Sequence, residues 1–386
     1  MRRVYLDHAS GTPLDPRVLE AMRTCLEERL GNPSGLHRPA REAREAVETA
    51  RREIASLLQG RPEEIVFTAS ASEANNLALK GLALAASGRR RGIIAAATEH
   101  VSILHPLRTL AGAGFPVRLL PVDRHGLVDP DDLKEALRPD TLLVSVAHAS
   151  GEIGTLQPLE SIARVAHEGG ALFHTDATMT AGLIPLPAGP EGPDLVTLSA
   201  ALLYGPSGVG ALRVGPGLRL KPVIEGGTQE GGLRAGSEPV ASIVGFGIAA
   251  RLAVLEREPR ATRADALSAR LRGALFESIR GLVPTGHPVR RLPGHLSLCV
   301  EGLEAEALLR GLDEAGVDAA SGSACTTGAS KPSHVLEAIG VGPALARGAL
   351  LLTCGEANAD DDPERGGAAI RAIVAHLRDL SPLVTS

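Results

Sequence analysis

The 386-residue sequence lacks the features that mark secreted, membrane and nucleic-acid-binding proteins. Neither the N-terminal segment MRRVYLDHAS nor any other part contains an apolar run long enough for a signal peptide or a membrane span. The formal net charge is −5, so there is no basic surplus that would favour nucleic acid or an anionic membrane surface. We therefore expect a cytoplasmic protein with no nucleic-acid partner and no membrane partner.

Cysteine and lysine are both scarce. The four cysteines form no CxxC pair, which argues against a zinc knuckle, and disulfides are not expected in a reducing cytosol; they are Cys25, Cys299, Cys325 and Cys354. Of 40 basic residues, four are lysines, namely Lys80, Lys134, Lys221 and Lys331. Few positions could therefore supply a reactive amine.

Short apolar runs alternate with helical patterns over the first two-thirds of the chain. Most of the runs lack strict alternation, as is typical of strands buried on both faces of a parallel sheet. The predicted strands are Ile65–Thr68, Gly92–Thr98, Val117–Val122, Thr141–Ala147, Ala171–Asp176, Asp194–Ser199 and Val209–Val214. Because helices fall between several of them, we expect an α/β fold with a doubly wound sheet.

An early helix begins at Asp15-Pro16, since proline is favoured in the first turn of a helix, and Gly31 is expected to end it. Its apolar face carries Val18, Met22, Cys25 and Leu26. We expect this face to be buried, with Cys25 as an ordinary core thiol.

The pattern changes after about Arg257. A long amphipathic helix, Ala264–Leu282, is followed by strand His295–Val300, strand Ala349–Thr353 and a last helix, Asp362–Leu377. We expect a large α/β domain over residues 15–257. Residues 1–14 and 258–386 would form a smaller α+β domain, which carries a loop of small residues around Cys325.

Motifs follow one another in order along nearly the whole chain. They are YLDHASGTP (5–13), GNPSGLH (31–37), IVFTASASEANN (65–76), TEH (98–100), HTDAT (174–178), YGPSG (204–208), GGTQEGGLRAGS (226–237), SGSACT (321–326) and RDLSP (378–382). Through these motifs the sequence resembles cysteine desulfurases of the NifS/IscS type, which are class V aminotransferases. The resemblance implies the type I fold of PLP-dependent transferases, with a mostly parallel seven-stranded sheet, helices on both faces and a smaller α+β domain.

The resemblance also implies pyridoxal phosphate (PLP) as the cofactor. Ala71 and Ser72 lie where strand Ile65–Thr68 turns into a helix, and backbone N–H groups there can hold a phosphate. An ordinary helix cap is the alternative. Asp176 matches the aspartate that pairs with the pyridinium nitrogen; the alternative is a carboxylate that caps a loop.

The remaining family positions concern the ring of the cofactor and the second subunit. His100 matches the histidine that stacks on the ring, and its alternative is an ordinary loop histidine. Ser199 belongs to the motif that carries the lysine in the family. Ser237 ends a segment, Arg234–Ser237, that the family contributes from the other subunit, so we expect a homodimer.

The sequence departs from the family at the lysine motif. The family has Ser-Gly-His-Lys-x-Tyr-Gly-Pro, whereas residues 199–206 read Ser-Ala-Ala-Leu-Leu-Tyr-Gly-Pro. Leu202 occupies the lysine position and Ala201 the histidine position. Without the lysine, no amine binds PLP covalently or acts as a base.

Further departures affect the ring and the substrate. Ser150 and Gly151 replace the asparagine pair at the ring, and Met179 replaces the glutamine that faces its oxygen. Leu351 replaces the arginine that binds the substrate carboxylate. We expect Leu202, Ala201, Met179 and Leu351 to surround one partly apolar cavity, in which PLP is not covalently bound.

Three hypotheses follow. The first is a non-catalytic partner in sulfur handling or iron–sulfur assembly, in which Cys325 carries a persulfide or ligates a cluster and a sulfur acceptor or iron–sulfur scaffold protein is the partner. The second is an active desulfurase, converting L-cysteine to L-alanine and a persulfide, with non-covalent PLP or in a heterodimer with an intact paralogue. The third is a binding protein for another small molecule in the altered pocket.

Overall fold

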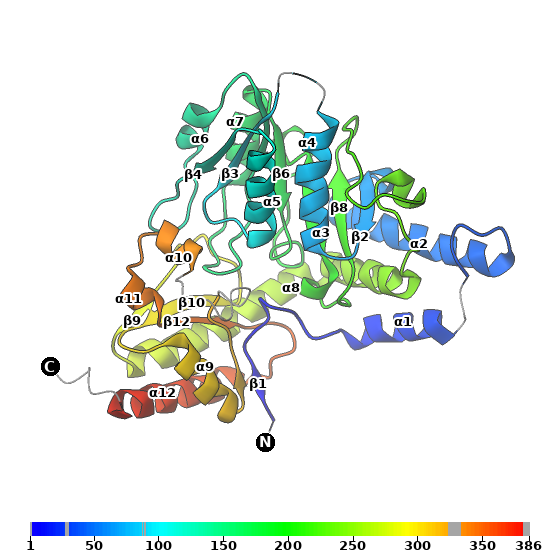
Figure 1. Cartoon of the computed structure of the whole chain (residues 1–386). Coiled ribbons are helices and arrows are strands. Elements are labelled where there is room, and N and C mark those ends of the chain that lie inside the picture. The colour runs from blue at the N-terminus through cyan, green and yellow to red at the C-terminus, as the bar shows by residue number, and fades with distance from the viewer. Residues whose placement is uncertain (1, 28–30, 87, 89, 323–332, 381–386) are drawn as a thin grey trace.

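A computed structural model describes residues 2–27, 31–86, 88, 90–322 and 333–380. Its largest element is a seven-stranded sheet in the order β2-β8-β7-β6-β5-β3-β4 (Figure 1). The strands are β2 (Ile65–Thr68), β3 (Gly92–Ala96), β4 (Val117–Leu120), β5 (Thr141–Ser145), β6 (Leu172–Asp176), β7 (Leu195–Ser199) and β8 (Gly210–Val214). β8 runs antiparallel to both of its neighbours, while the other pairs are parallel. The expected α/β class and all seven predicted strands are confirmed, with ends that differ by one or two residues.

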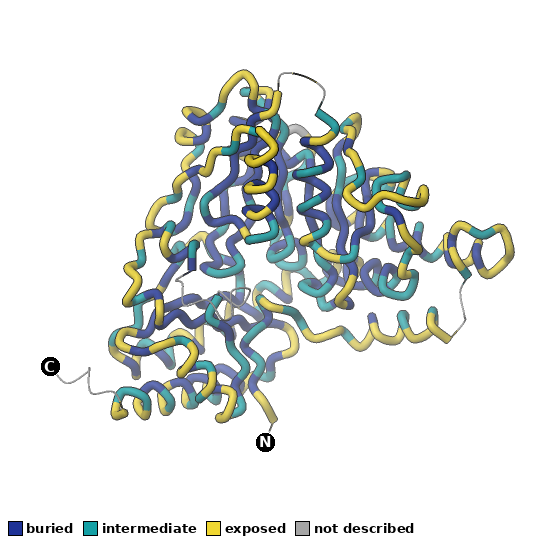
Figure 2. The backbone as a smooth tube through the Cα atoms, in the orientation of Figure 1, coloured by how far each residue is buried: buried dark blue, intermediate teal, exposed yellow. Residues whose placement is uncertain are grey.

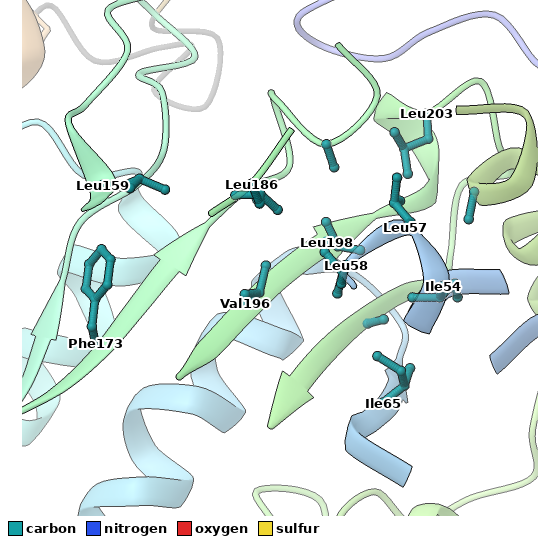
Figure 3. Packing of buried hydrophobic residues seen from close by; sticks show 14 of the residues in the cluster. Ile54, Leu57, Leu58, Ile65, Leu159, Phe173, Leu186, Val196, Leu198 and Leu203 are labelled. Carbon is teal, nitrogen blue, oxygen red and sulfur yellow. The ribbon is translucent and has the colours of Figure 1, made fainter. Parts of the chain in front are cut away.

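Helices cover both faces of this sheet, as expected. One face packs on α2 (Arg38–Leu57), α6 (Pro130–Ala136), α7 (Leu159–Glu168) and the first part of α8 (Val240–Ser278). Figure 3 shows Ile54 and Leu57 of α2, and Leu58 directly after it, on the side of the sheet that carries Val196 and Leu198 of β7. The other face packs on α5 (Val101–Gly112) and on α3 (Ala71–Asn76), the π-helix η2 (Leu77–Gly81) and α4 (Leu82–Ala85), which follow one another directly. The sheet is therefore buried on both sides, and its strands are mostly dark blue in Figure 2, apart from the edge strand β4, which is partly exposed.

A second, smaller core surrounds an antiparallel sheet in the order β12-β10-β9. Its strands are β9 (Leu282–Pro284), β10 (His295–Val300) and β12 (Ala349–Thr353). Near it lie α9 (Ala305–Glu314), α10 (His334–Ala338), α11 (Pro343–Ala346) and α12 (Asp362–Leu380). The N-terminal strand β1 (Val4–Tyr5) pairs with β11 (Val317–Asp318), so the N-terminal segment joins this region. Since α8 runs through residue 257, the expected domain boundary falls inside a helix, and the division into two domains stays a prediction.

The first helix, α1, spans Pro16–Glu27 and packs on α8. Val18 is buried, and Met22 fits against Gly245 of α8, where a Cβ would come within 2.7 Å of the methionine sulfur. Leu26, however, is 68% exposed and Cys25 is only half-buried. The prediction of a buried face was therefore wrong for both residues, because α8 covers only the Val18 side of this helix.

None of the helices in the described part of the chain combines the length and the apolar character that crossing a membrane requires.

Candidate functional site

The turn from β2 into α3 is shaped by two reciprocal hydrogen bonds. The hydroxyl of Ser70 accepts a hydrogen bond from the backbone N–H of Glu73 (3.2 Å), and the Glu73 carboxylate accepts one from the N–H of Ala69 (2.8 Å). This arrangement resembles a capping box, which stabilises a helix start. Gly210 of β8 lies against the turn, where a Cβ would be 2.6 Å from the carbonyl carbon of Ser70. The cap is thus Ser70, while the predicted phosphate-binding Ser72 is exposed on the first turn of the helix.

Three elements meet at the carboxyl end of β6 through a chain of side-chain hydrogen bonds. The amide nitrogen of Asn75 on α3 donates to Asp176 Oδ2 (2.8 Å) and to Ser102 Oγ (2.9 Å). Ser102 in turn lies 2.7 Å from Nδ1 of His100, the N-cap residue of α5. His100 and Asp176, which the sequence predicts as site residues, are therefore linked to each other. The linking residues Asn75 and Ser102 were not predicted, although Asn75 belongs to one of the quoted motifs.

Asp176 is 8% exposed, at the end of a strand in the middle of the sheet. Its second carboxylate oxygen accepts a hydrogen bond from the backbone N–H of Thr178 (3.0 Å). A buried carboxylate without a cationic partner is costly, and hydrogen bonds to both oxygens offset part of that cost. The geometry is suited to holding a group that donates one more hydrogen bond, since each oxygen can accept two.

The other predicted site residues are more dispersed. Ser199 is half-buried at the end of β7, and Ser150 is buried, with its hydroxyl 3.4 Å from the N–H of Ile153. The carbonyl of Gly151 accepts a hydrogen bond from His295 Nε2 (3.0 Å). Ser237 is exposed between the 3-10 helix η5 (Gln229–Gly232) and α8. The segment before Ser237 is anchored by the Arg234–Glu73 ion pair (3.0 Å).

Leu202 ends a short 3-10 helix, η4 (Ala200–Leu202), directly after β7. It lines a cavity of about 50 Å³, together with Met179 and Leu203. Two of the four apolar replacements thus share one cavity, as expected. Ala201 and Leu351 do not line it, and that part of the prediction was wrong.

The reason for the error is visible in β12. Alternate side chains of a strand face opposite sides, and Leu350 and Leu352 belong to the smaller core. The Leu351 side chain therefore faces the other side, while its backbone forms an antiparallel bridge with Ala320. Ala201 is held by the N-terminal segment, because its carbonyl accepts hydrogen bonds from the N–H (2.9 Å) and the hydroxyl (3.0 Å) of Thr12.

Comparison with known proteins decides the family. The aminotransferase class-V family matches residues 4–355. The chain belongs to this family. It is 42% identical to the cysteine desulfurase IscS of Dictyoglomus turgidum over 99% of this chain and 97% of that one. It is also 42% identical to cysteine desulfurase IscS 1 of Archaeoglobus fulgidus, over 98% and 99% of the two chains.

Solved structures agree with this assignment. A NifS-like protein superposes with a TM-score of 0.91 at 33% identity, covering 97% of this chain and all of that one. A structure titled SspA in complex with cysteine gives a TM-score of 0.78 at 35% identity, over 90% and 98% of the chains. The resemblance to cysteine desulfurases and the PLP type I fold are therefore confirmed.

The class-V family is PLP-dependent, so its cofactor is the natural test of this site. The buried Asp176 and the start of α3 fit the pyridinium and phosphate ends of PLP. The covalent end does not fit at Leu202, the position predicted for the family's lysine, because a leucine side chain has no amine. Among the described lysines, Lys80 is in η2, Lys134 in α6 and Lys221 follows β8, and none of them lines the cavity at Leu202. Lys331 lies outside the described residues.

Two of the four cysteines are buried thiols. Cys299 in β10 and Cys354 after β12 are buried, and burial raises the pKa of these thiols to about 11 and about 12. Both are therefore protonated and unreactive at neutral pH. Cys325 lies outside the described residues, and the described chain contains no group of three or more His, Cys, Asp or Glu that could hold a metal ion.

Proposed function

We propose that this class-V protein does not catalyse PLP-dependent cysteine desulfuration and instead handles sulfur for another protein. The observation that carries the proposal is Leu202, an apolar side chain at the lysine position and in a largely apolar cavity. A covalent PLP enzyme needs an amine at this position to hold the cofactor. Met179, beside Leu202, removes a second polar contact to the ring.

The first test is the absorbance of the purified protein, before and after addition of PLP. The proposal predicts no PLP band in the purified protein. A stable band that survives dialysis would favour the alternative of an active desulfurase with non-covalent PLP. A band that appears only when an intact paralogue is co-expressed would favour a heterodimer.

The sulfur-handling role is assigned to Cys325. Its neighbours in the sequence are Ser, Gly, Ala and Thr, which offer little apolar bulk to suppress thiolate formation. In transfer, the Cys325 thiolate would attack the outer sulfur of a donor persulfide; that sulfur would become the outer atom of a Cys325 persulfide, and the donor would leave as a thiolate. A cluster ligand is the alternative role, with further ligands supplied by a scaffold protein.

Brief alkylation of the native protein, followed by peptide mapping, tests this assignment. Cys325 should be labelled first, while Cys299 and Cys354 should stay protected. After exposure to sodium polysulfide, mass spectrometry should locate the added sulfur on Cys325. Cys325→Ser should remove this signal, and the matched variant Cys25→Ser should retain it. Preferential labelling of Cys25 or Cys299 would contradict the assignment.

We also propose that the protein is a homodimer. The segment that leads to Ser237, residues 223–237, begins with two exposed apolar side chains, Val223 (37% accessible) and Ile224 (42% accessible). Two such side chains next to each other are unusual on a monomer surface. The same segment is anchored to α2 and β2, where the Glu230 carboxylate binds Arg51 of α2 (2.8 Å) and accepts a hydrogen bond from the N–H of Phe67 of β2 (2.7 Å). A fixed and partly apolar segment is suited to a permanent interface.

A further inference from the structure

Arg260 is a buried cation whose hydrogen-bonding capacity is incompletely used. The residue is 3% exposed and lies in α8, directly after Pro259. Its Nη2 binds Glu256 Oε2 (2.6 Å), and its guanidinium lies over the ring of Tyr204, 5.0 Å from the ring centre. Both Nε and Nη1 are buried without a hydrogen-bond partner among the described residues. Leaving buried donors of a charged group unsatisfied is costly.

Arg260 belongs to a cluster of two arginines and two carboxylates whose charges balance one another. Arg17 binds Asp15 (2.7 Å) and Glu256 (2.5 Å), and Asp15 lies 3.7 Å from Arg260. These two carboxylates are shared between two arginines, so the four-residue cluster has no net charge. The pKa values of Asp15 and Glu256 are lowered, mainly by hydrogen bonds from Arg17, which keeps both ionised. The cluster thus positions Arg260 without supplying acceptors for Nε and Nη1.

Arg260 also lines the cavity at Leu202, and it is the one permanently charged side chain among the described lining residues. The other titratable groups there are neutral at pH 7. Burial lowers the pKa of His8 and of His295 to about 4, and raises that of Cys354 to about 12. Burial also raises the pKa of Tyr204. No Asp or Glu lines this cavity in the described part of the chain.

Most of the remaining lining is apolar, and the hydroxyls of its two threonines, Thr12 and Thr353, donate to the backbone carbonyls of Ala201 and Leu6. Leu183, Leu202, Leu203 and Met179 surround the space beside the guanidinium. Tyr204 is held at φ 60°, a left-handed conformation that non-glycine residues rarely adopt, and its hydroxyl accepts a hydrogen bond from the N–H of Glu356 (2.7 Å). The cavity therefore combines one positive charge with a hydrocarbon wall. None of Ser72, His100, Asp176 or Ser199 lines it, whereas Leu202 and Met179, at the predicted lysine and glutamine positions of the family, do.

We propose that this cavity binds a small monocarboxylate with a hydrocarbon body, whose carboxylate accepts hydrogen bonds from Arg260. A carboxylate supplies the missing acceptors, and an apolar tail fits the leucine wall. An amino acid fits less well, because its ammonium group would have no carboxylate partner in the cavity. A phosphate dianion also fits poorly, because it would need more donors than one arginine offers.

Butanoate is a suitable probe because the cavity is small, with butanamide and 2-aminobutanoate as matched controls. Isothermal titration of the full-length protein should show saturable binding of butanoate. Binding of the uncharged amide and of the amino acid should be at least about tenfold weaker, the ratio that a charge-assisted hydrogen bond typically gives. Equal binding of butanoate and butanamide, or no saturable binding of butanoate at millimolar concentration, would overturn the proposal.

Two variants locate the site. Arg260→Gln should lose butanoate binding, and Leu202→Phe should block the cavity while leaving the arginine cluster intact. Unchanged affinity in a folded sample of either variant would contradict the assignment. If Arg260→Gln does not fold, Leu202→Phe and the comparison of the three probes still decide the question. Cys325→Ser should bind butanoate like the parent chain, so this test is independent of the proposed sulfur-handling role.

Discussion

At the scale of single residues, the replacement at position 202 has the largest chemical consequence. In the proposed function, Leu202 of η4 offers a hydrocarbon side chain at the position predicted for the family's amine, and Met179 and Gly151 offer no polar side chain in its place. Groups that act together in a site depend on one another, so the repair of one group recovers little activity.

We therefore predict that Leu202→Lys will not restore sulfide release from L-cysteine, even with added PLP. The substrate would still lack the arginine that Leu351 replaces, and the ring would still lack its partners. Leu202→Met is the matched control for altered packing, and both variants should stay at the background of the parent chain. Substantial sulfide production by Leu202→Lys alone would mean that the other replacements matter little.

At the scale of an element, the short helix α3 organises the predicted site, because it carries both Ser72 and Asn75. Its start depends on Ser70, and loss of an N-cap side chain typically costs about 1 kcal/mol. Ser70→Ala should lower the free energy of unfolding by roughly this amount. Ser72→Ala is the matched control on the same helix turn, and its effect should be within about 0.5 kcal/mol, as for an ordinary exposed position. Urea unfolding measures both, and a larger loss for Ser72→Ala would reverse the assignment of the cap.

The elements of the large sheet could be predicted from the sequence because each strand is a local apolar run bounded by turn residues. The seven strands, β10 and β12 were found in this way. Burial of a helix face could not be predicted equally well, since Leu26 and Val18 belong to the same pattern and differ only in what α8 covers. The prediction that Leu351 lines the cavity was wrong for a similar reason. The sequence of a strand shows that its side chains alternate between two sides, but it does not show which side faces a cavity.

The candidate site could be predicted in part. His100 and Asp176 were recognised through family motifs, and the structure links them through Asn75 and Ser102. Arg260 has no local signal, because the residues that reveal its role come from distant parts of the chain. Tyr204, Leu183 and Thr353 come from distant parts of the chain and line one cavity with this arginine in the folded molecule. Tertiary packing thus creates a feature that no single motif contains.

At the scale of the whole molecule, buried titratable groups predict a stability maximum near pH 6.5. Burial lowers the pKa of His8, His148, His174 and His295 to about 4, below the value of about 6.5 in an unfolded chain. Between these values the unfolded state binds more protons, so the free energy of unfolding falls as the pH decreases. Burial raises the pKa of Glu99 to about 8 and that of Glu152 to about 7. These two carboxyls bind more protons in the folded state from about pH 4.5 upward. Above about pH 6.5 the histidines no longer offset this difference, so the free energy of unfolding falls as the pH rises.

Urea unfolding at pH 5, 6.5 and 8.5 checks this prediction, with the largest free energy of unfolding expected at pH 6.5. Glu99→Gln should reduce the decrease in the free energy of unfolding between pH 6.5 and pH 8.5. Glu306→Gln is the control, since the Glu306 side chain is 84% exposed. A stability that rises steadily up to pH 8.5 would contradict the assignment of buried, protonated carboxyl groups.

The proposed homodimer predicts a molar mass of twice 39.9 kDa in light scattering at micromolar concentration. Ile224→Glu should shift the protein towards the monomer, because a charge would be buried in the interface. Val289→Glu is the matched control at another exposed apolar side chain, 82% accessible, and should leave the dimer intact. A monomeric parent chain would contradict the proposal.

The most direct test of the central claim is borohydride reduction of the purified protein in the presence of PLP, followed by peptide mass measurement. An amine that holds PLP covalently becomes a stable pyridoxyl adduct under these conditions. Because Leu202 replaces the lysine and no described lysine lines the cavity, we predict no specific adduct on any of the four lysines. A stoichiometric pyridoxyl adduct on Lys80, Lys134, Lys221 or Lys331 would contradict the account.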